Sequence, residues 1–217
     1  MSLRINDTIP DLSVTTDKGE ISLHDFVGDS WAVIFSHPKD FTPVCTTEFS
    51  AVAKLAGEWA SRNTKVLGVS VDGVEDHVKW KADIESLEGA KPEFAIVADD
   101  GLEMAKAFDM LPAEAVLPDG RTPADSATVR SVFIVGPDKK LKLSMTYPMT
   151  VGRNFSEILR ALDALQTSGR ENVATPANWS VGDDIVVPVA VSDADAIAKY
   201  GAIETKLPYL RTAKLPS

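Results

Sequence analysis

Short apolar runs alternate with amphipathic segments through the middle of the chain, and this alternation constrains the fold more than any other feature. Residues 31–36 (WAVIFS) form a nearly continuous apolar run, which predicts a strand buried on both faces. After Cys45, apolar residues recur at helical spacing from 49 to 60, which predicts an amphipathic helix with Cys45 at its start. The same alternation predicts two more strands and two more helices, at residues 65–71, 94–98, 74–87 and 102–108. Strands that alternate with helices need crossover connections, so the sequence predicts an α/β fold.

Two later strands are predicted at 131–135 and 141–147, on either side of the turn-forming residues 136–140 (GPDKK). A hairpin pairs its strands antiparallel, so we expect a mixed sheet with 141–147 at its edge. Asn154 is the expected N-cap of a helix over residues 155–166, which has one apolar face.

The hydrophobic pattern of the sequence changes from about residue 171 onward. Short apolar pieces are broken there by proline and glycine, and long periodic segments are few. A length of 217 residues suits one large domain with a smaller addition. We therefore expect a main domain at 1–168 and a small, loop-rich C-terminal module at 169–217.

Charge and composition exclude several classes of protein. The chain has 22 Lys and Arg against 32 Asp and Glu, a formal net charge of −10, so nucleic acid is not an expected partner. No apolar stretch approaches the roughly 20 residues needed to span a bilayer, so stable membrane insertion is not expected. The first ten residues lack the apolar core of a secretory signal, and one cysteine cannot form an intramolecular disulfide. These features lead us to expect a cytoplasmic protein.

The segment 38–45 (PKDFTPVC) gives the clearest indication of a reactive site in the sequence. It places Thr42 three residues before Cys45, at the junction of a strand, a loop and a helix. The unpaired N–H groups and partial positive charge of a helix N-terminus favour the thiolate, which is the nucleophilic form. Pro38 and Pro43 restrict the loop, and the Thr42 hydroxyl can donate to and accept from a small polar substrate. A lone cysteine is more often an inert buried side chain, but this position favours a reactive thiol.

Residues 35–38 (FSHP) and 45–48 (CTTE) flank a pattern, P-x-x-x-T-x-x-C, that resembles the active-site signature of the peroxiredoxins and closely resembles that of their one-cysteine (1-Cys) subfamily. Later blocks resemble the same subfamily, at residues 130–134, 136–143, 147–148, 152–155 and 173–179. The resemblance implies a thioredoxin-like α/β fold, with a mixed central sheet flanked by helices and a small C-terminal extension used in dimer contacts. It also implies a thiol-specific peroxidase that reduces hydrogen peroxide and organic, including lipid, hydroperoxides.

The resemblance assigns roles to individual residues. Cys45 would be the peroxidatic residue, whose thiolate attacks the O–O bond, forms a sulfenic acid and releases water or an alcohol. Thr42 would hydrogen-bond the peroxide, Pro38 would shield the site, and Arg130 would stabilise the thiolate and the departing oxygen. Three further residues match the family and would support these groups: His37, Glu48 and Arg153. Without the resemblance, Arg130 would be interpreted as a surface cation and Glu48 as a residue that complements the helix dipole.

With one cysteine, the sulfenic acid has no internal thiol with which to condense. The partners expected are therefore a peroxide substrate and an external thiol reductant, either glutathione or a thioredoxin-like protein. No cofactor is expected, and no metal, because His24, His37 and His77 are far apart in the sequence and only one thiol exists. The unpaired edge at 141–147 also predicts a homodimer or a higher homo-oligomer.

A serine-type phospholipase or esterase is the main alternative. Residues 28–32 (GDSWA) resemble the G-x-S-x-G pattern of serine lipases. If the resemblance extends to the catalytic residues, Ser30 would be the nucleophile, His24 the base and Asp138 the acid. The last glycine is replaced by Ala32, and the motif precedes its strand, so a turn is the favoured interpretation. A cysteine hydrolase and a non-catalytic redox switch or holdase that responds through Cys45 are the other hypotheses.

Overall fold

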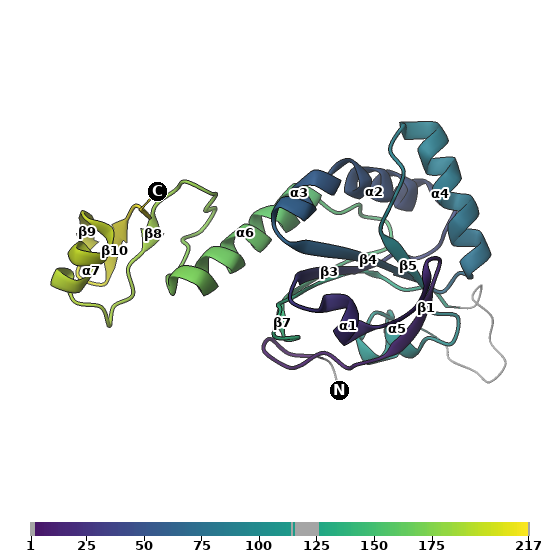
Figure 1. The fold of residues 1–217 in the computed structure, drawn as a ribbon, viewed down its shortest axis with the longest axis horizontal. Helices are drawn as coiled ribbons and strands as arrows, with labels where there is room; N and C mark the ends of the chain where they lie inside the picture. The colour runs from purple at the N-terminus through teal and green to yellow at the C-terminus, as the bar shows by residue number, and fades with distance from the viewer. Residues whose placement is uncertain (1–2, 114, 116–125, 217) are drawn as a thin grey trace. The chain divides into compact units, whose positions relative to one another are not determined.

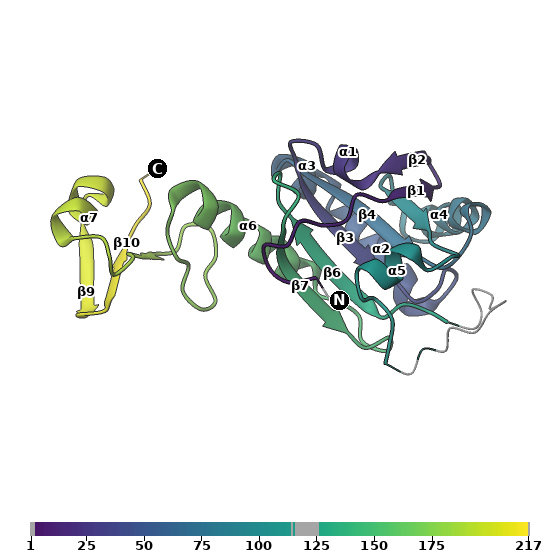
Figure 2. The same ribbon diagram turned by 90° about the horizontal axis from the view of Figure 1, so that it is seen from below.

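The structure is a computed structural model that describes residues 3–113, 115 and 126–216. It divides into two compact units, Met1–Phe155 and Ser156–Ser217. The predicted boundary at residue 168 falls inside a helix that runs across the start of the second unit. Figures 1 and 2 show the two units, each of which is described by itself below.

The first unit is built on a seven-stranded sheet with the order β2-β1-β5-β4-β3-β6-β7. Its strands are β1 (Ser13–Thr16), β2 (Gly19–Ser22), β3 (Trp31–Ser36), β4 (Thr64–Ser70), β5 (Ala95–Ala98), β6 (Arg130–Val135) and β7 (Leu141–Tyr147). The β3–β4 and β4–β5 pairs are parallel, whereas β3–β6, β6–β7, β1–β2 and β1–β5 are antiparallel. The predicted mixed sheet, with β7 at an edge, is confirmed.

Helices cover both faces of this sheet. They are α1 (Leu23–Val27), α2 (Pro43–Lys54), α3 (Ala56–Ser61), α4 (Val74–Glu88) and α5 (Glu103–Ala107). Figure 1 shows α2, α3 and α4 on one side of the sheet and α1 and α5 on the other. The β3–α2 loop (residues 37–42) joins an inner strand of the sheet to a helix that packs on the first of these faces.

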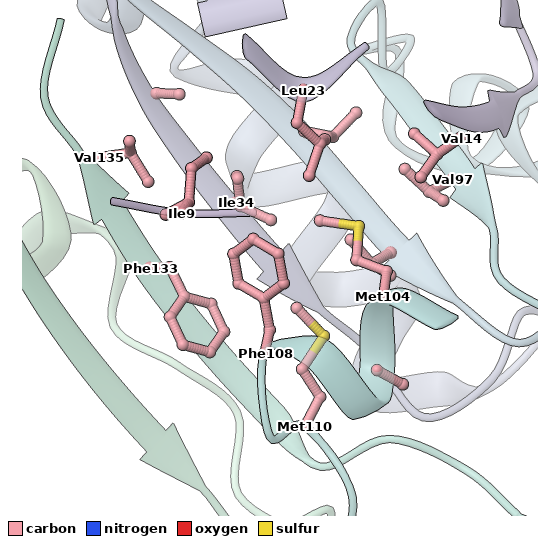
Figure 3. Packing of buried hydrophobic residues seen from close by; sticks show 14 of the residues in the cluster. Ile9, Val14, Leu23, Ile34, Val97, Met104, Phe108, Met110, Phe133 and Val135 are labelled. Carbon is pink, nitrogen blue, oxygen red and sulfur yellow. The ribbon is translucent and has the colours of Figure 1, made fainter. Parts of the chain in front are cut away.

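A buried apolar cluster fixes the sheet against α1 and α5 (Figure 3). Met104 of α5 and Phe108 just after it are fully buried against sheet residues such as Ile34. The rings of Phe108 and Phe133 meet edge to face, with centroids 5.3 Å apart. This packing makes β3 and β6, which hold the candidate site, a rigid base.

The second unit has its own core and its own sheet. It contains α6 (Phe155–Glu171, which begins at the last residue of the first unit), β8 (Ile185–Val186), α7 (Asp193–Tyr200), β9 (Ile203–Leu207) and β10 (Leu210–Ala213). The three strands are antiparallel in the order β8-β10-β9. Val173, Ile185, Ala196 and Tyr200 belong to its buried cluster. The loop-rich segment foreseen from the sequence thus contains a small α/β unit.

Two features of the first unit differ from the prediction. The single helix expected through residues 49–60 is two helices, because the chain leaves α-helical geometry at Leu55 (φ −94°, ψ 14°) between α2 and α3. The hairpin β1–β2 and helix α1 were not predicted, since elements of four or five residues carry too little periodicity. Across the described residues, no helix combines the length and apolar character needed to cross a membrane.

Candidate active site

Cys45 lies in the first turn of α2, as the sequence predicted. Thr42 is the N-cap residue, with extended backbone, and Pro43 occupies the first helical position, where its missing N–H costs nothing. The first backbone hydrogen bond of the helix runs from the N–H of Thr46 to the carbonyl of Thr42, 3.0 Å. The N–H of Cys45 therefore belongs to the group that a helix start leaves without intrahelical partners. The thiol itself is fully buried.

Arg130, the first residue of β6, brings a cation onto this thiol. Its Nη1 lies 3.3 Å from Cys45 Sγ and donates to Glu48 Oε2 at 2.7 Å. Its Nε donates to the carbonyl of Met149 at 2.8 Å, which fixes the guanidinium plane. Arg130 is 3% exposed, so its charge acts on the sulfur with little screening by water. The arrangement places a fixed positive charge beside the sulfur of Cys45.

Glu48, one turn after Cys45, is shared by two arginines. Its Oε1 accepts from the backbone N–H and Nε of Arg153 at 2.8 and 2.9 Å, and its Oε2 accepts from Arg153 Nη2 at 2.6 Å and from Arg130. Burial acts to raise the pKa of Glu48, but the hydrogen bonds and charge of Arg153, with the charge of Arg130, outweigh it and hold the pKa below its ordinary value. Glu48 is therefore a carboxylate that orients both guanidinium groups.

Arg153 ties this group to the sheet. Its Nη1 donates to the carbonyls of Ser36 at 2.8 Å and Ser131 at 2.9 Å, at the ends of β3 and β6. Its guanidinium lies over the rings of Phe35 and Phe155, 5.0 and 5.6 Å from their centroids. One side chain thus fixes Glu48 relative to both strands that border the site.

Thr42 and Pro38 lie on the β3–α2 loop, which leads to the helix that carries the thiol. The Thr42 hydroxyl donates to the carbonyl of Lys39 at 2.8 Å, so its lone pairs remain available to accept a hydrogen bond. Pro38 is buried, whereas Thr42 is partly exposed. Thr42 also lines an open groove of about 520 Å³ whose other walls include Phe41, Trp80 and Leu87. A small substrate can therefore approach Thr42 from solvent.

His37 is the first residue of the loop, and it is fully buried. Its ring stacks on Trp80 with centroids 5.1 Å apart and meets Phe49 edge to face at 4.6 Å. Burial lowers the pKa of His37, and the hydrogen bond to Asp40 opposes this only in part. His37 is accordingly a neutral imidazole in the wall of the site.

The sequence analysis missed Asp40 and His77. The two oxygens of the Asp40 carboxylate are each 2.6 Å from an imidazole nitrogen, Nε2 of His37 and Nδ1 of His77. Distance along the chain had suggested that these histidines lie apart, which is wrong for this pair. A signal was available, because loops that follow neighbouring parallel strands such as β3 and β4 meet at one edge of the sheet.

Nitrogen and oxygen atoms of His37, Asp40 and Asp72 lie within 4.8 Å of one another, a spacing that metal ligands also show. Here the ring and the carboxylates are already hydrogen-bonded to each other and to their neighbours. The group is therefore a buried hydrogen-bond cluster, in which Nδ1 of His37 is left without a hydrogen-bond partner.

The three residues of the serine-hydrolase alternative are not joined to one another. Ser30 donates to Asn63 Oδ1 at 3.2 Å, and Nε2 of His24 donates to the carbonyl of Ile9 at 2.8 Å. Asp138 accepts from Lys142 at 2.7 Å. Ser30 also precedes β3, whereas a nucleophile elbow follows a strand. The hydrogen bonds of these three described side chains do not form a Ser–His–Asp relay.

A buried thiol at a helix start, with a guanidinium on its sulfur, defines a protein that uses cysteine as a nucleophile. Comparison with known proteins gives the family. The model of the AhpC/TSA family matches residues 5–144, and that of the C-terminal domain of 1-Cys peroxiredoxin matches residues 164–202. The chain therefore belongs to the AhpC/TSA family, in its 1-Cys peroxiredoxin branch, and is a thiol-dependent peroxidase. The family, the fold class and the activity predicted from the sequence are confirmed.

Individual relatives match over nearly the whole chain. The mitochondrial peroxiredoxin PRX1 of Saccharomyces cerevisiae is 48% identical over 98% of this chain and 81% of its own length. Peroxiredoxin-6 of Mus musculus is 45% identical over 99% of this chain and 98% of its own. The crystal structure of a mutant of peroxiredoxin 6 of Arenicola marina has a TM-score of 0.91, with 42% identity and complete coverage of both chains. A structure of the yeast mitochondrial 1-Cys peroxiredoxin has a TM-score of 0.87, with 46% identity over 98% of this chain and 99% of the other.

Proposed function

We propose that Cys45 is the peroxidatic residue of this enzyme. The observation that supports this proposal is the 3.3 Å approach of Arg130 to Sγ in a buried first helical turn. The thiolate sulfur attacks the terminal oxygen of ROOH, an S–O bond forms, the O–O bond breaks and RO⁻ departs. Cys45 becomes a sulfenic acid, and RO⁻ takes a proton to leave as water or an alcohol.

Arg130 stabilises the negative charge as it moves from sulfur to the departing oxygen. A fixed cation in a site shielded from water needs little reorganisation during the step. Glu48 and Arg153 orient this cation, since Glu48 holds Arg130 and Arg153 holds Glu48. The charges of the two arginines and Glu48 sum to +1, which a thiolate at Cys45 balances.

Thr42 accepts a hydrogen bond from the O–H of the bound peroxide. This role is supported by its donor bond to Lys39, which leaves the oxygen lone pairs for the substrate. The buried Pro38 shields the reacting atoms from water, and the neutral ring of His37 forms part of the wall. Thr42 lines an apolar groove, and we propose hydrogen peroxide and organic, including lipid, hydroperoxides as substrates that enter there.

An external thiol completes the cycle. The sequence holds one cysteine, so the sulfenic acid condenses with a thiol RSH to give a mixed disulfide and water. A second thiol then releases Cys45 and RSSR. The yeast mitochondrial 1-Cys peroxiredoxin resolves its thiol via the glutathione and thioredoxin systems, and we propose glutathione or a thioredoxin-like protein as reductant here.

We also propose a homodimer in which β7 pairs with its own copy. β7 ends the sheet, and within the described part of the chain the N-terminal segment bonds to its first residue, where the N–H of Asn6 donates to Leu141 and that of Leu141 to Asp7. Residues 142–147 remain as an edge that a second chain can pair with. Because Cys45 must return to the thiol, a reducing compartment such as the cytoplasm is the proposed location, although the yeast relative is mitochondrial.

Turnover separates this proposal from a redox switch. With excess reductant and peroxide, we expect many peroxide molecules to be reduced per protein chain, and none by Cys45→Ser. A single stoichiometric oxidation without turnover would support the switch. Ester hydrolysis that survives in Cys45→Ser and is lost in Ser30→Ala would support the hydrolase.

A further inference from the structure

Asp40 is a buried carboxylate in the middle of the β3–α2 loop, and it is held from three directions. Its side chain is 2% exposed and bonds to His37 within the loop and to His77 in the first turn of α4. Its backbone N–H donates to Asp72 Oδ2 at 2.9 Å, just after β4. Asp72 Oδ2 also accepts from the hydroxyl of Ser70 at 2.8 Å. Asp40 therefore anchors the loop to a neighbouring strand and to a helix.

His77 contacts two acceptors. Nδ1 lies 2.6 Å from the Asp40 carboxylate, and Nε2 lies 3.3 Å from the carbonyl oxygen of Val97. Burial acts to raise the pKa of Asp40, but the hydrogen bonds from His37 and His77 outweigh it and lower this pKa. The Asp40 carboxylate is thus a buried acceptor that the two imidazole rings share.

The residue after Asp40 is strained. Phe41 has φ +55°, in the left-handed region, which is unfavourable for a residue with a β-carbon. Its ring is 51% exposed, so side-chain packing does little to hold the conformation. The backbone is fixed instead on its two sides, by Asp40 before it and by the start of α2 after it. Without the Asp40 anchor, Phe41 would relax to negative φ and Thr42 would move.

We propose that His77 is a positioning residue for the peroxide step, acting through Asp40 on the loop that carries Thr42. The hydrogen bond between His77 and Asp40 holds the strained conformation that sets the Thr42 hydroxyl beside the first turn of α2. This role rests on the proposed function of Cys45 and Thr42. It predicts a division of labour, in which Arg130 controls the thiolate and His77 controls the site of the peroxide.

The test uses two substitutions at His77 and a matched control. His77→Asn retains a donor near the Nδ1 position, and His77→Leu removes it. Lys81→Gln is the control, because Lys81 lies on the same helix and forms a different buried polar contact, an ion pair with Asp17. Each variant is assayed for the second-order rate of Cys45 oxidation by stoichiometric hydrogen peroxide and for the pH midpoint of Cys45 alkylation by iodoacetamide.

We expect His77→Leu to slow oxidation by about tenfold or more, because small displacements at a reacting site carry costs of that order. His77→Asn should lose less, and the alkylation midpoint should stay unchanged in both variants. Lys81→Gln should keep the wild-type oxidation rate per folded molecule. Adding Phe41→Gly to His77→Leu should restore part of the rate, because glycine adopts positive φ without strain.

Each other outcome has a distinct meaning. Wild-type oxidation rates in both His77 variants would overturn the positioning role, as would an equal loss in Lys81→Gln. A shifted alkylation midpoint would also overturn it, since His77 would then act on the thiolate. If His77→Leu does not fold, the comparison of His77→Asn with and without Phe41→Gly decides the question. Slow oxidation of the wild-type protein would instead refute the proposed function of Cys45.

Discussion

Nη1 of Arg130 lies 3.3 Å from Sγ of Cys45, although 85 positions separate the two residues in the chain. The contact forms because β6, which begins at Arg130, pairs with β3, and β3 leads through a six-residue loop to the helix that carries Cys45. Both side chains are buried, so water competes little with this contact in the folded protein. This relationship links the sheet to the chemistry of the thiol.

Replacement of Arg130 tests that link. We expect Arg130→Ala to slow the attack on hydrogen peroxide by about 100-fold or more, since loss of one preorganised charge donor typically costs this much. Alkylation of Cys45 should also require a higher pH, because the cation no longer favours the thiolate. Stopped-flow oxidation and a pH series of alkylation measure the two effects. Arg62→Ala, which removes an exposed ion pair with Glu58, is the control, and an unchanged pH series in Arg130→Ala would contradict the account.

Glu48 should be important for stability as well as for orientation. In Glu48→Gln, two buried guanidinium groups lose the carboxylate that they share, so we expect the free energy of unfolding to fall by about 3–5 kcal/mol. Denaturant unfolding at neutral pH measures the change. Glu58→Gln removes an exposed carboxylate from its pair with Arg62 and should cost about 0.5 kcal/mol or less. Similar losses of unfolding free energy in the two variants would show that the buried interactions of Glu48 stabilise the protein no more than an exposed ion pair does.

The same carboxylate predicts a pH dependence of stability. The pKa of Glu48 is lower in the folded protein than in the unfolded chain, where it is about 4.3. Its contribution is therefore complete above that value and is lost as the pH falls through the folded pKa. Urea unfolding between about pH 3 and pH 6 should show a steeper loss of stability in the wild type than in Glu48→Gln. Parallel curves would contradict this assignment, and a residual slope in the variant is expected from Asp40, whose pKa is also lowered.

Much of the fold follows from local pattern, and the exceptions have physical causes. Strand β3 and the start of α2 were predicted closely, because a buried strand and an amphipathic helix have distinct periods; the helix was expected to start at Cys45 and begins two residues earlier, at Pro43. The interruption at Leu55 was invisible, since apolar spacing continues across it. The short hairpin β1–β2 is held by tertiary pairing with β5, which a local pattern does not reveal.

Some features of the candidate site could likewise be predicted from local sequence, and others could not. The position of Cys45 and the nearness of Thr42 could be argued from a few adjacent residues. The convergence of Arg130 and Arg153 on Glu48 joins segments about a hundred residues apart, and only resemblance to a family suggested it. The pair of Asp40 and His77 was missed because neither the hydrophobic pattern nor the signature around Cys45 includes His77.

The proposed dimer predicts a concentration-dependent pattern of amide exchange. Backbone amides in residues 142–147 should exchange more slowly as protein concentration rises through dimer formation, because edge N–H groups gain partners. β2, at the opposite edge of the sheet, serves as the internal control and should show no such change. Exchange followed by mass spectrometry, alongside sedimentation, measures both. A dimer in which β7 stays unprotected would place the interface elsewhere.

The central claim is that the fold activates Cys45 toward peroxide. The most direct test adds one equivalent of hydrogen peroxide to the reduced protein, follows the rate of oxidation and records the intact mass of the product. The account predicts rapid gain of one oxygen atom, trapped by a sulfenic-acid reagent and absent in Cys45→Ser. Oxidation no faster than that of a free thiol would contradict it, because the contact with Arg130 would then have no chemical consequence.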